Sequence, residues 1–265
     1  MRKIVDMTKK LLITFIVMFV VLTGLIGYIL VRDGNMVPKE TSVVETPEPT
    51  ETPEATPTPT PTVDPESDPR FTSTESVLIF ANKKHKLPDG YEPSDLTLLT
   101  VPTAYGDVYM RQEASEAMSN MIAAANADGV YPVVTTAYRD YSFQESLYNG
   151  YVERDGVEAA DTYSSRPGYS DHQTGLAADI SSESNSYNLN QDFENTAEGQ
   201  WLAAHAHEYG FVMRYPNGKE SVTGYTYEPW HFRYIGVEEA TNLYNTDPNM
   251  TMEEYYGIAG GDYAE

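Results

Sequence analysis

A proline-rich segment, residues 37–69, constrains most strongly how this chain can fold. It reads VPKETSVVETPEPTETPEATPTPTPTVDPESDP, with proline every few residues and mainly threonine and glutamate between. Such a composition cannot bury an apolar core and favours an extended, hydrated chain. We therefore expect a disordered linker over residues 32–70 and a folded domain over residues 71–265. At about 3.1 Å per residue in polyproline geometry, the linker could span roughly 90 Å.

An uncharged apolar run, residues 11–31, precedes the linker. At about 1.5 Å per residue, a helix of this length crosses a bilayer core of about 30 Å. Four basic residues lie among residues 1–10 and only Arg32 follows closely, so the first ten residues are expected in the cytoplasm and the rest outside. A cleaved signal peptide is the alternative, although the run is long for one and no small-residue cleavage motif follows. These features predict a single-pass membrane protein with an extracellular C-terminal domain.

The folded part is strongly acidic and has no cysteine. Residues 71–265 hold 30 of the 40 acidic residues but 10 of the 17 basic ones. This charge would repel phosphate backbones, so no nucleic-acid partner is expected. Without cysteine the chain can form neither disulfides nor thiolate metal sites. Any metal site must therefore use histidine, aspartate and glutamate.

Hydrophobic patterning predicts both helices and strands in the folded part. Apolar residues at helical spacing predict a helix over residues 113–128, and a second helix over residues 194–209 is expected to end at Gly210. Apolar and β-branched runs predict strands. These strands are expected at the start of residues 76–99 and over residues 132–138, 175–180, 211–215 and 230–235.

Arg139 lies where a predicted strand meets another predicted helix. Ser142 is expected to cap that helix, with Glu145 three residues later completing a capping box. Functional side chains are often presented at such junctions. A surface arginine is an equal alternative on these residues alone.

Two segments carry residues suited to metal chemistry. Residues 164–181, SSRPGYSDHQTGLAADIS, contain His172 and Asp179, and the later EPWH supplies Glu228 and His231. Two imidazoles, a carboxylate and a further glutamate are typical of a catalytic zinc site. The proline of EPWH opposes a helix there, which excludes the helical zinc-protease motif. On spacing alone, a buried histidine bonded to a carboxylate remains the alternative.

The other three histidines fit a structural or surface role. His205 and His207 are two apart on a predicted helix and point to different sides of it. His85 lies among lysines, whose charges would repel a cation. We expect none of the three to bind a metal.

The sequence around the metal-suited residues resembles the VanY-type D-alanyl-D-alanine carboxypeptidases, zinc peptidases that belong with the lysostaphin and Hedgehog-like fold. SDHQTGLAAD matches their SxHxxGxAxD signature, TAYRDYSFQ is similar to their (S/T)AYRSxxxQ block, and EPWHFRYIG resembles a later block. The similarity covers nearly all of residues 76–257. It departs at Asp140, where serine is usual, and at Asp171, where glutamate is common. The resemblance implies an α+β fold with a central antiparallel sheet flanked by helices.

The resemblance also implies a role for each candidate residue. His172, Asp179 and His231 would bind Zn²⁺ and leave a fourth position for water, as in catalytic sites. Glu228 would act as general base, and Arg139 would polarise the scissile carbonyl and stabilise the oxyanion. The implied substrate contacts are Ser170 and Gln144, with Trp230 as a wall of the site or, alternatively, a core aromatic.

Together these features predict a membrane-anchored zinc D,D-carboxypeptidase that removes the terminal D-alanine from peptidoglycan stem peptides outside the cell. An L,D-carboxypeptidase acting on tetrapeptide stems, or a crossbridge endopeptidase, is an alternative with the same chemistry. A non-catalytic wall-binding module is an alternative of another class, and the complete set of site residues argues against it. A secreted structural metal-binding domain would need a fourth protein ligand, for which the sequence offers no obvious candidate.

Overall fold

The computed structural model describes residues 64–263. The expected membrane span, residues 11–31, and most of the expected linker lie outside this range. Short helical turns at η1 (Pro65–Ser67) and α2 (Pro69–Thr72) open the described part, so helical structure is present on the N-terminal side of the expected boundary at residue 71. Within residues 64–263, no helix combines the length and the hydropathy needed to cross a bilayer.

A four-stranded antiparallel sheet lies at the centre of the domain, in the order β3-β4-β6-β5. The two interior strands, β4 and β6, are buried at every position. The expected strands are confirmed here with shorter bounds: β3 (Val133–Thr136), β4 (Ala177–Ser181), β5 (Phe211–Met213) and β6 (His231–Tyr234). A separate antiparallel pair joins β1 (Leu96–Leu98) to β2 (Tyr109–Arg111).

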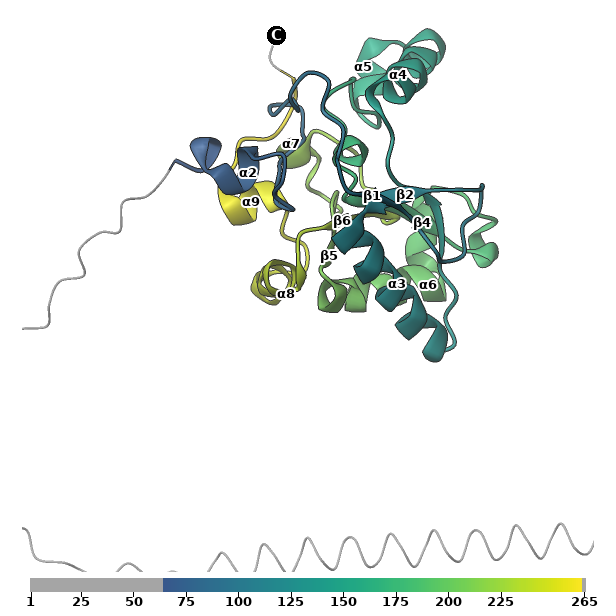
Figure 1. The fold of residues 1–265 in the computed structure, drawn as a ribbon. Helices are drawn as coiled ribbons and strands as arrows, with labels where there is room; N and C mark the ends of the chain where they lie inside the picture. Colours follow the sequence, from purple (N-terminus) through teal and green to yellow (C-terminus); the bar gives the residue numbers. More distant parts are fainter. Residues whose placement is uncertain (1–63, 264–265) are drawn as a thin grey trace, which may run out of the picture. The chain divides into compact units, whose positions relative to one another are not determined.

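Helices flank this sheet (Figure 1). The expected first helix is confirmed as α3 (Gln112–Ala127), which buries Met118, Met121 and Ile122 in the main core. Figure 1 shows α3 and α6 (Ala197–His205) on one side of the strands and α4 (Tyr141–Asp155) with α5 (Val157–Asp161) at the opposite end. The remaining helical segments are η2 (Asp171–Thr174), η3 (Glu183–Asn185), η4 (Gln191–Asn195), η5 (Ala206–Tyr209), α7 (Glu220–Thr223), α8 (Val237–Thr246) and α9 (Met252–Tyr256). The α+β fold with a central antiparallel sheet is confirmed.

The helix expected over residues 194–209 is divided into shorter pieces. Thr196 caps α6 by accepting a hydrogen bond from the Gly199 N–H at 2.9 Å, so the helix starts after η4. Its last turn tightens into η5, and Gly210 ends it as expected, with a left-handed φ of 86°. A Cβ at Gly210 would lie 2.6 Å from the Tyr234 ring, so the position also needs glycine for space.

The apolar run at the start of residues 76–99 is not a strand, contrary to expectation. Ile79 and Phe80 are buried, but the backbone here forms turns. The carbonyls of Val77 and Ile79 accept hydrogen bonds from the Arg233 guanidinium at 3.0 and 2.7 Å. A side chain therefore supplies the donors that a neighbouring strand would have supplied.

The cap of α4 is also different from the one expected. The helix begins at Tyr141, which places Ser142 inside its first turn. Asp140 is the N-cap, and its Oδ1 accepts from the Phe143 N–H and from the Ser142 hydroxyl, both at 2.7 Å. Aspartate is among the strongest N-caps, so it replaces the serine as the helix start.

Candidate metal centre

The pairing of β4 with β6 builds the base of the metal centre. Asp179 and His231 are cross-strand partners in this antiparallel register. His172 lies in η2, just before β4, and Gly175 turns the chain between the two with a left-handed φ of 69°. A Cβ there would meet the Arg111 side chain at 3.0 Å, which leaves room only for glycine.

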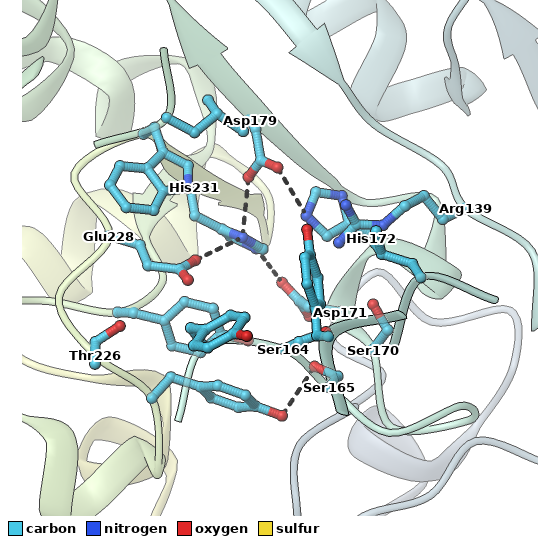
Figure 2. Close-up of a pocket in the computed structure, with 17 residues that line it drawn as sticks. Arg139, Ser164, Ser165, Ser170, Asp171, His172, Asp179, Thr226, Glu228 and His231 are labelled. Carbon is cyan, nitrogen blue, oxygen red and sulfur yellow. Dashed lines mark hydrogen bonds and ion pairs between the residues drawn. The ribbon is translucent and has the colours of Figure 1, made fainter. Parts of the chain in front are cut away.

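The three expected ligands converge in the structure. His172, Asp179 and His231 are buried and each brings one ligand atom within 4.8 Å of the others, the one such triad in residues 64–263. His172 Nε2 lies 3.3 Å from Asp179 Oδ2, and His231 Nδ1 lies 3.2 Å from Asp179 Oδ1. Figure 2 shows the Asp179 carboxylate between the two imidazoles.

Hydrogen bonds decide which nitrogen of each imidazole is free to bind a metal. His172 Nδ1 lies 2.8 Å from the Ala137 carbonyl, which can only accept, so this nitrogen carries the hydrogen. His231 Nε2 lies 3.3 Å from Asp171 Oδ2 and donates to it in the same way. The lone pairs of His172 Nε2 and His231 Nδ1 therefore both face Asp179, an arrangement typical of metal-binding histidines.

This donor set fits zinc. Two imidazole nitrogens and one carboxylate oxygen are ligands that Zn²⁺ prefers, and three protein ligands are typical of a catalytic site. Asp179 Oδ1 is buried and receives no hydrogen bond within residues 64–263, although it lies 3.2 Å from His231 Nδ1. A buried carboxylate oxygen without a donor is costly unless a cation completes it.

The ligands have perturbed ionisation in the metal-free protein. Burial opposes ionisation of Asp179, but His172 and His231 hold its pKa far below the usual range. Burial and the charge of Arg139 lower the pKa of His172, which keeps that imidazole neutral. Burial also acts to lower the pKa of His231, yet the adjacent carboxyl groups of Asp171, Asp179 and Glu228 raise it well above the ordinary value. A metal must therefore displace a proton from His231.

Glu228 and Arg139 lie on opposite sides of the triad (Figure 2). Glu228 Oε2 lies 3.4 Å from His231 Nδ1, and burial raises the pKa of this carboxyl. The backbone N–H of Arg139 donates to the backbone carbonyl of His172 at 3.3 Å. Its Nε is buried and has no hydrogen-bond partner within residues 64–263. The triad therefore has a carboxyl group with a raised pKa on one side and a guanidinium whose Nε lacks a hydrogen-bond partner on the other.

A cavity of about 300 Å³ is lined by the three triad residues and by Glu228 and Arg139. Its floor is the metal triad with Glu228 and Arg139. Its wall, which faces that floor, is carried by α4 and by the segment after α5. The wall residues are Leu147, Tyr151, Tyr163, Ser164 and Ser165.

The three expected substrate contacts are placed differently from one another. Ser170 is buried and lines the cavity. Trp230 lines it too and also packs against the main core, so both of its expected roles are compatible with its place. Gln144 does not line the cavity. Its Nε2 donates to the Ser165 carbonyl at 2.7 Å, so Gln144 supports the wall from behind.

The histidines set aside from the sequence do not join the centre. His205 lies 3.1 Å from the exposed Glu208 carboxylate. The His207 ring stacks on Tyr244 with centroids 3.7 Å apart. Conversely, Asp171 contacts the ligand His231, a role that the sequence does not predict; its position next to His172 is the one available signal.

Comparison with known proteins agrees with this geometry. The sequence profile of the family described as "VanY: D-alanyl-D-alanine carboxypeptidase" matches residues 107–237, which include every residue of the floor. The Bacillus subtilis protein YodJ is 41% identical over 186 residues, which are 69% of this chain and 67% of YodJ. The chain belongs to the VanY family of D-alanyl-D-alanine carboxypeptidases.

Two solved structures extend the comparison from sequence to fold. The LdcB LD-carboxypeptidase has a TM-score of 0.65 at 38% identity, over 71% of this chain and 89% of LdcB. A VanY D,D-pentapeptidase variant in complex with Zn(II) has a TM-score of 0.56 at 31% identity, over 68% of this chain and 98% of that one. This VanY-family chain is a metallopeptidase, and zinc is the metal that its triad fits.

Proposed function

We propose that this VanY-family chain removes the terminal D-alanine from peptidoglycan stem peptides outside the cell. The observation that carries the proposal is the convergence of the zinc triad with Glu228 and Arg139 in one cavity. A module that only binds cell wall needs no carboxyl with a raised pKa beside a three-ligand metal centre. A structural metal site would be closed by a fourth protein ligand.

The chain's own residues account for the steps of hydrolysis. Bound zinc would supply Lewis acidity and lower the pKa of an attacking water towards about 7. Glu228 takes a proton from the water and passes it to the leaving amine, a transfer that suits a carboxyl whose pKa is raised. Arg139 donates to the carbonyl oxygen as negative charge develops on it. Its Nε has no hydrogen-bond partner within residues 64–263.

Substrate contacts follow from the lining of the cavity. Ser170 offers a hydroxyl beside the triad, and Trp230 offers an apolar surface. Gln144 would act indirectly by holding the Ser165 carbonyl. An extended linker over residues 32–70 and an anchor over residues 11–31 would let the domain reach the wall from the membrane.

An L,D-carboxypeptidase is the second candidate. It is favoured by the LdcB structure, whose identity and TM-score, 38% and 0.65, exceed the 31% and 0.56 of the zinc-bound VanY. Both reactions would use the same floor and release D-alanine. They differ in the residue before the scissile bond, which is D-alanine in a pentapeptide stem and an L-centre in a tetrapeptide stem.

The test is release of D-alanine by the full chain from pentapeptide and tetrapeptide stems. Release from the pentapeptide alone supports the D,D assignment, and release from the tetrapeptide alone supports the L,D assignment. Glu228→Gln should abolish release from either. Activity that survives this substitution and a zinc chelator would exclude the proposed chemistry. Location is tested separately, by protease digestion of intact cells and by sequencing the mature N-terminus.

A further inference from the structure

A group of four buried charged residues lies directly beneath the metal centre. Asp171, Arg214, Arg233 and Glu253 are each at most 2% exposed. They come from η2, from the end of β5, from β6 and from α9. Their formal charges cancel, which is the condition under which ionised groups can be buried at all.

Hydrogen bonds and one longer ion pair connect these four residues into one network. Arg233 donates to Asp171 Oδ1, and Arg214 Nε lies 4.0 Å from Asp171 Oδ2. Arg214 also donates twice to Glu253, at 2.8 and 2.6 Å. Glu253 accepts a further bond from Asn82 at 2.9 Å. The network therefore joins Asn82 and Glu253 to Asp171, the residue that precedes His172.

The network ends on a metal ligand. Asp171 Oδ2 accepts the hydrogen of His231 Nε2 at 3.3 Å. This bond fixes the rotation of the ring and directs His231 Nδ1 towards Asp179, 3.2 Å away. The other histidine ligand, His172, is held by the neutral carbonyl of Ala137, so only His231 has a charged partner at the nitrogen that faces away from Asp179.

Stability alone is a weak account of such a network. Buried ion pairs regain in attraction roughly what they lose in hydration, and apolar replacements are often neutral or stabilising. A carboxylate bonded to a ligand histidine has a further consequence, because it fixes the tautomer and raises the basicity of the coordinating nitrogen.

We propose that Asp171 is a positioning residue for the zinc ligand His231. Asp171 holds His231 as the Nε2–H tautomer, and the hydrogen bond from Arg233 holds Asp171 in place. The sequence offers a matched control. Asp171 and Glu253 are both acidic members of this network, but only Asp171 touches a ligand. The inference rests on the zinc triad and not on which peptide bond is cut.

The experiment measures zinc affinity of the full chain by competition with a chelator. Asp171→Asn should weaken zinc binding by about 10- to 100-fold. Glu253→Gln removes the same charge from the same network and should reduce thermal stability while leaving zinc affinity near that of the unmodified protein. Cobalt substitution gives a second readout, since the visible spectrum should change in Asp171→Asn and not in Glu253→Gln. A folded Asp171→Asn protein with unchanged zinc affinity and cobalt spectrum would overturn the proposal.

A measurement on the unmodified protein covers the case in which Asp171→Asn does not fold. Long-range proton–nitrogen NMR of the zinc-loaded, histidine-labelled chain should find His231 protonated at Nε2 and His172 protonated at Nδ1. Protonation of His231 at Nδ1 instead would overturn the proposal. None of these readouts uses D-alanine release, so a wrong substrate assignment would leave them unaffected.

Discussion

Asp179 and His231 lie directly opposite each other on the neighbouring antiparallel strands β4 and β6. Paired residues in such a register project from the same face of a sheet. Both strands are interior and buried at every position, so a slip of one residue would move buried polar side chains to the opposite face, away from their partners, and is strongly opposed. Two of the three zinc ligands are therefore positioned by backbone pairing before any metal binds.

Removing the base and removing a ligand should have separable effects. Glu228→Gln keeps the shape of the side chain but cannot take a proton, so kcat should fall by about 10²- to 10⁴-fold with zinc still bound. Asp179→Asn should lose zinc itself, because a neutral amide is a poorer ligand than a carboxylate. Metal content and D-alanine release, measured on the same preparations, check both outcomes. Loss of zinc from Glu228→Gln would mean that Glu228 is a ligand and not the base.

Arg139 should act on the rate and not on the metal. Arg139→Ala removes the donor expected at the developing oxyanion, and such losses cost about 10²- to 10³-fold in kcat. Zinc affinity should be unchanged, because the guanidinium is not a ligand. Steady-state kinetics and chelator competition test the two parts. Arg70→Ala, at an arginine paired with Asp68 and far from the cavity in sequence, is the control. A rise in KM with kcat unchanged would assign Arg139 to ground-state binding instead.

Zinc binding should release one proton at neutral pH. In the metal-free protein the pKa of His231 is raised well above its ordinary value, whereas that of His172 is lowered. At pH 7 His231 is therefore protonated and His172 is neutral, and zinc must displace a single proton. Affinity should rise with pH by about tenfold per unit while the pH stays below the pKa of His231. Titration calorimetry in buffers of different ionisation enthalpy counts the protons. A count of zero or two would contradict this assignment.

The Asp140 N-cap of α4 should make a measurable contribution to the free energy of unfolding. Asp140→Ala removes the acceptor of the Phe143 N–H and should cost about 1 kcal/mol of unfolding free energy. Ser142→Ala removes only a hydroxyl that donates to Asp140, so its cost should be smaller. Denaturant unfolding of the two variants compares them directly. An equal or larger loss in Ser142→Ala would restore the serine as the cap.

The chain has few residue types that suit zinc, which narrowed the candidate ligands, and the resemblance to the VanY family then implied which of them bind. Without cysteine, five histidines and their carboxylate neighbours were the available zinc donors, and helical spacing removed His205 and His207. The β-branched and apolar runs also predicted the four sheet strands. Their lengths were overestimated because residues that flank a strand share its composition without sharing its pairing.

Contacts between distant segments could not be predicted from the sequence. Asp171 is bonded to residues 60 and 62 positions away, and no local pattern indicates that pairing. The apolar run before residue 81 was expected to be a strand because burial looks the same in a strand and in a buried turn. Its carbonyls accept from Arg233, more than 150 positions away. Gln144 was expected at the substrate from the family resemblance. Its actual position behind the wall depends on how α4 packs, which the sequence does not show.

The division of the cavity into floor and wall has a consequence for how such enzymes change. Two of the zinc ligands lie on strands of the sheet, whereas the wall residues all belong to residues 141–165, a continuous stretch of chain at the opposite end from α3 and α6 (Figure 1). An engineer could exchange that stretch between relatives and retain the zinc ligands. Evolution has the same option, so diversification towards new peptides need not pass through an inactive ancestor.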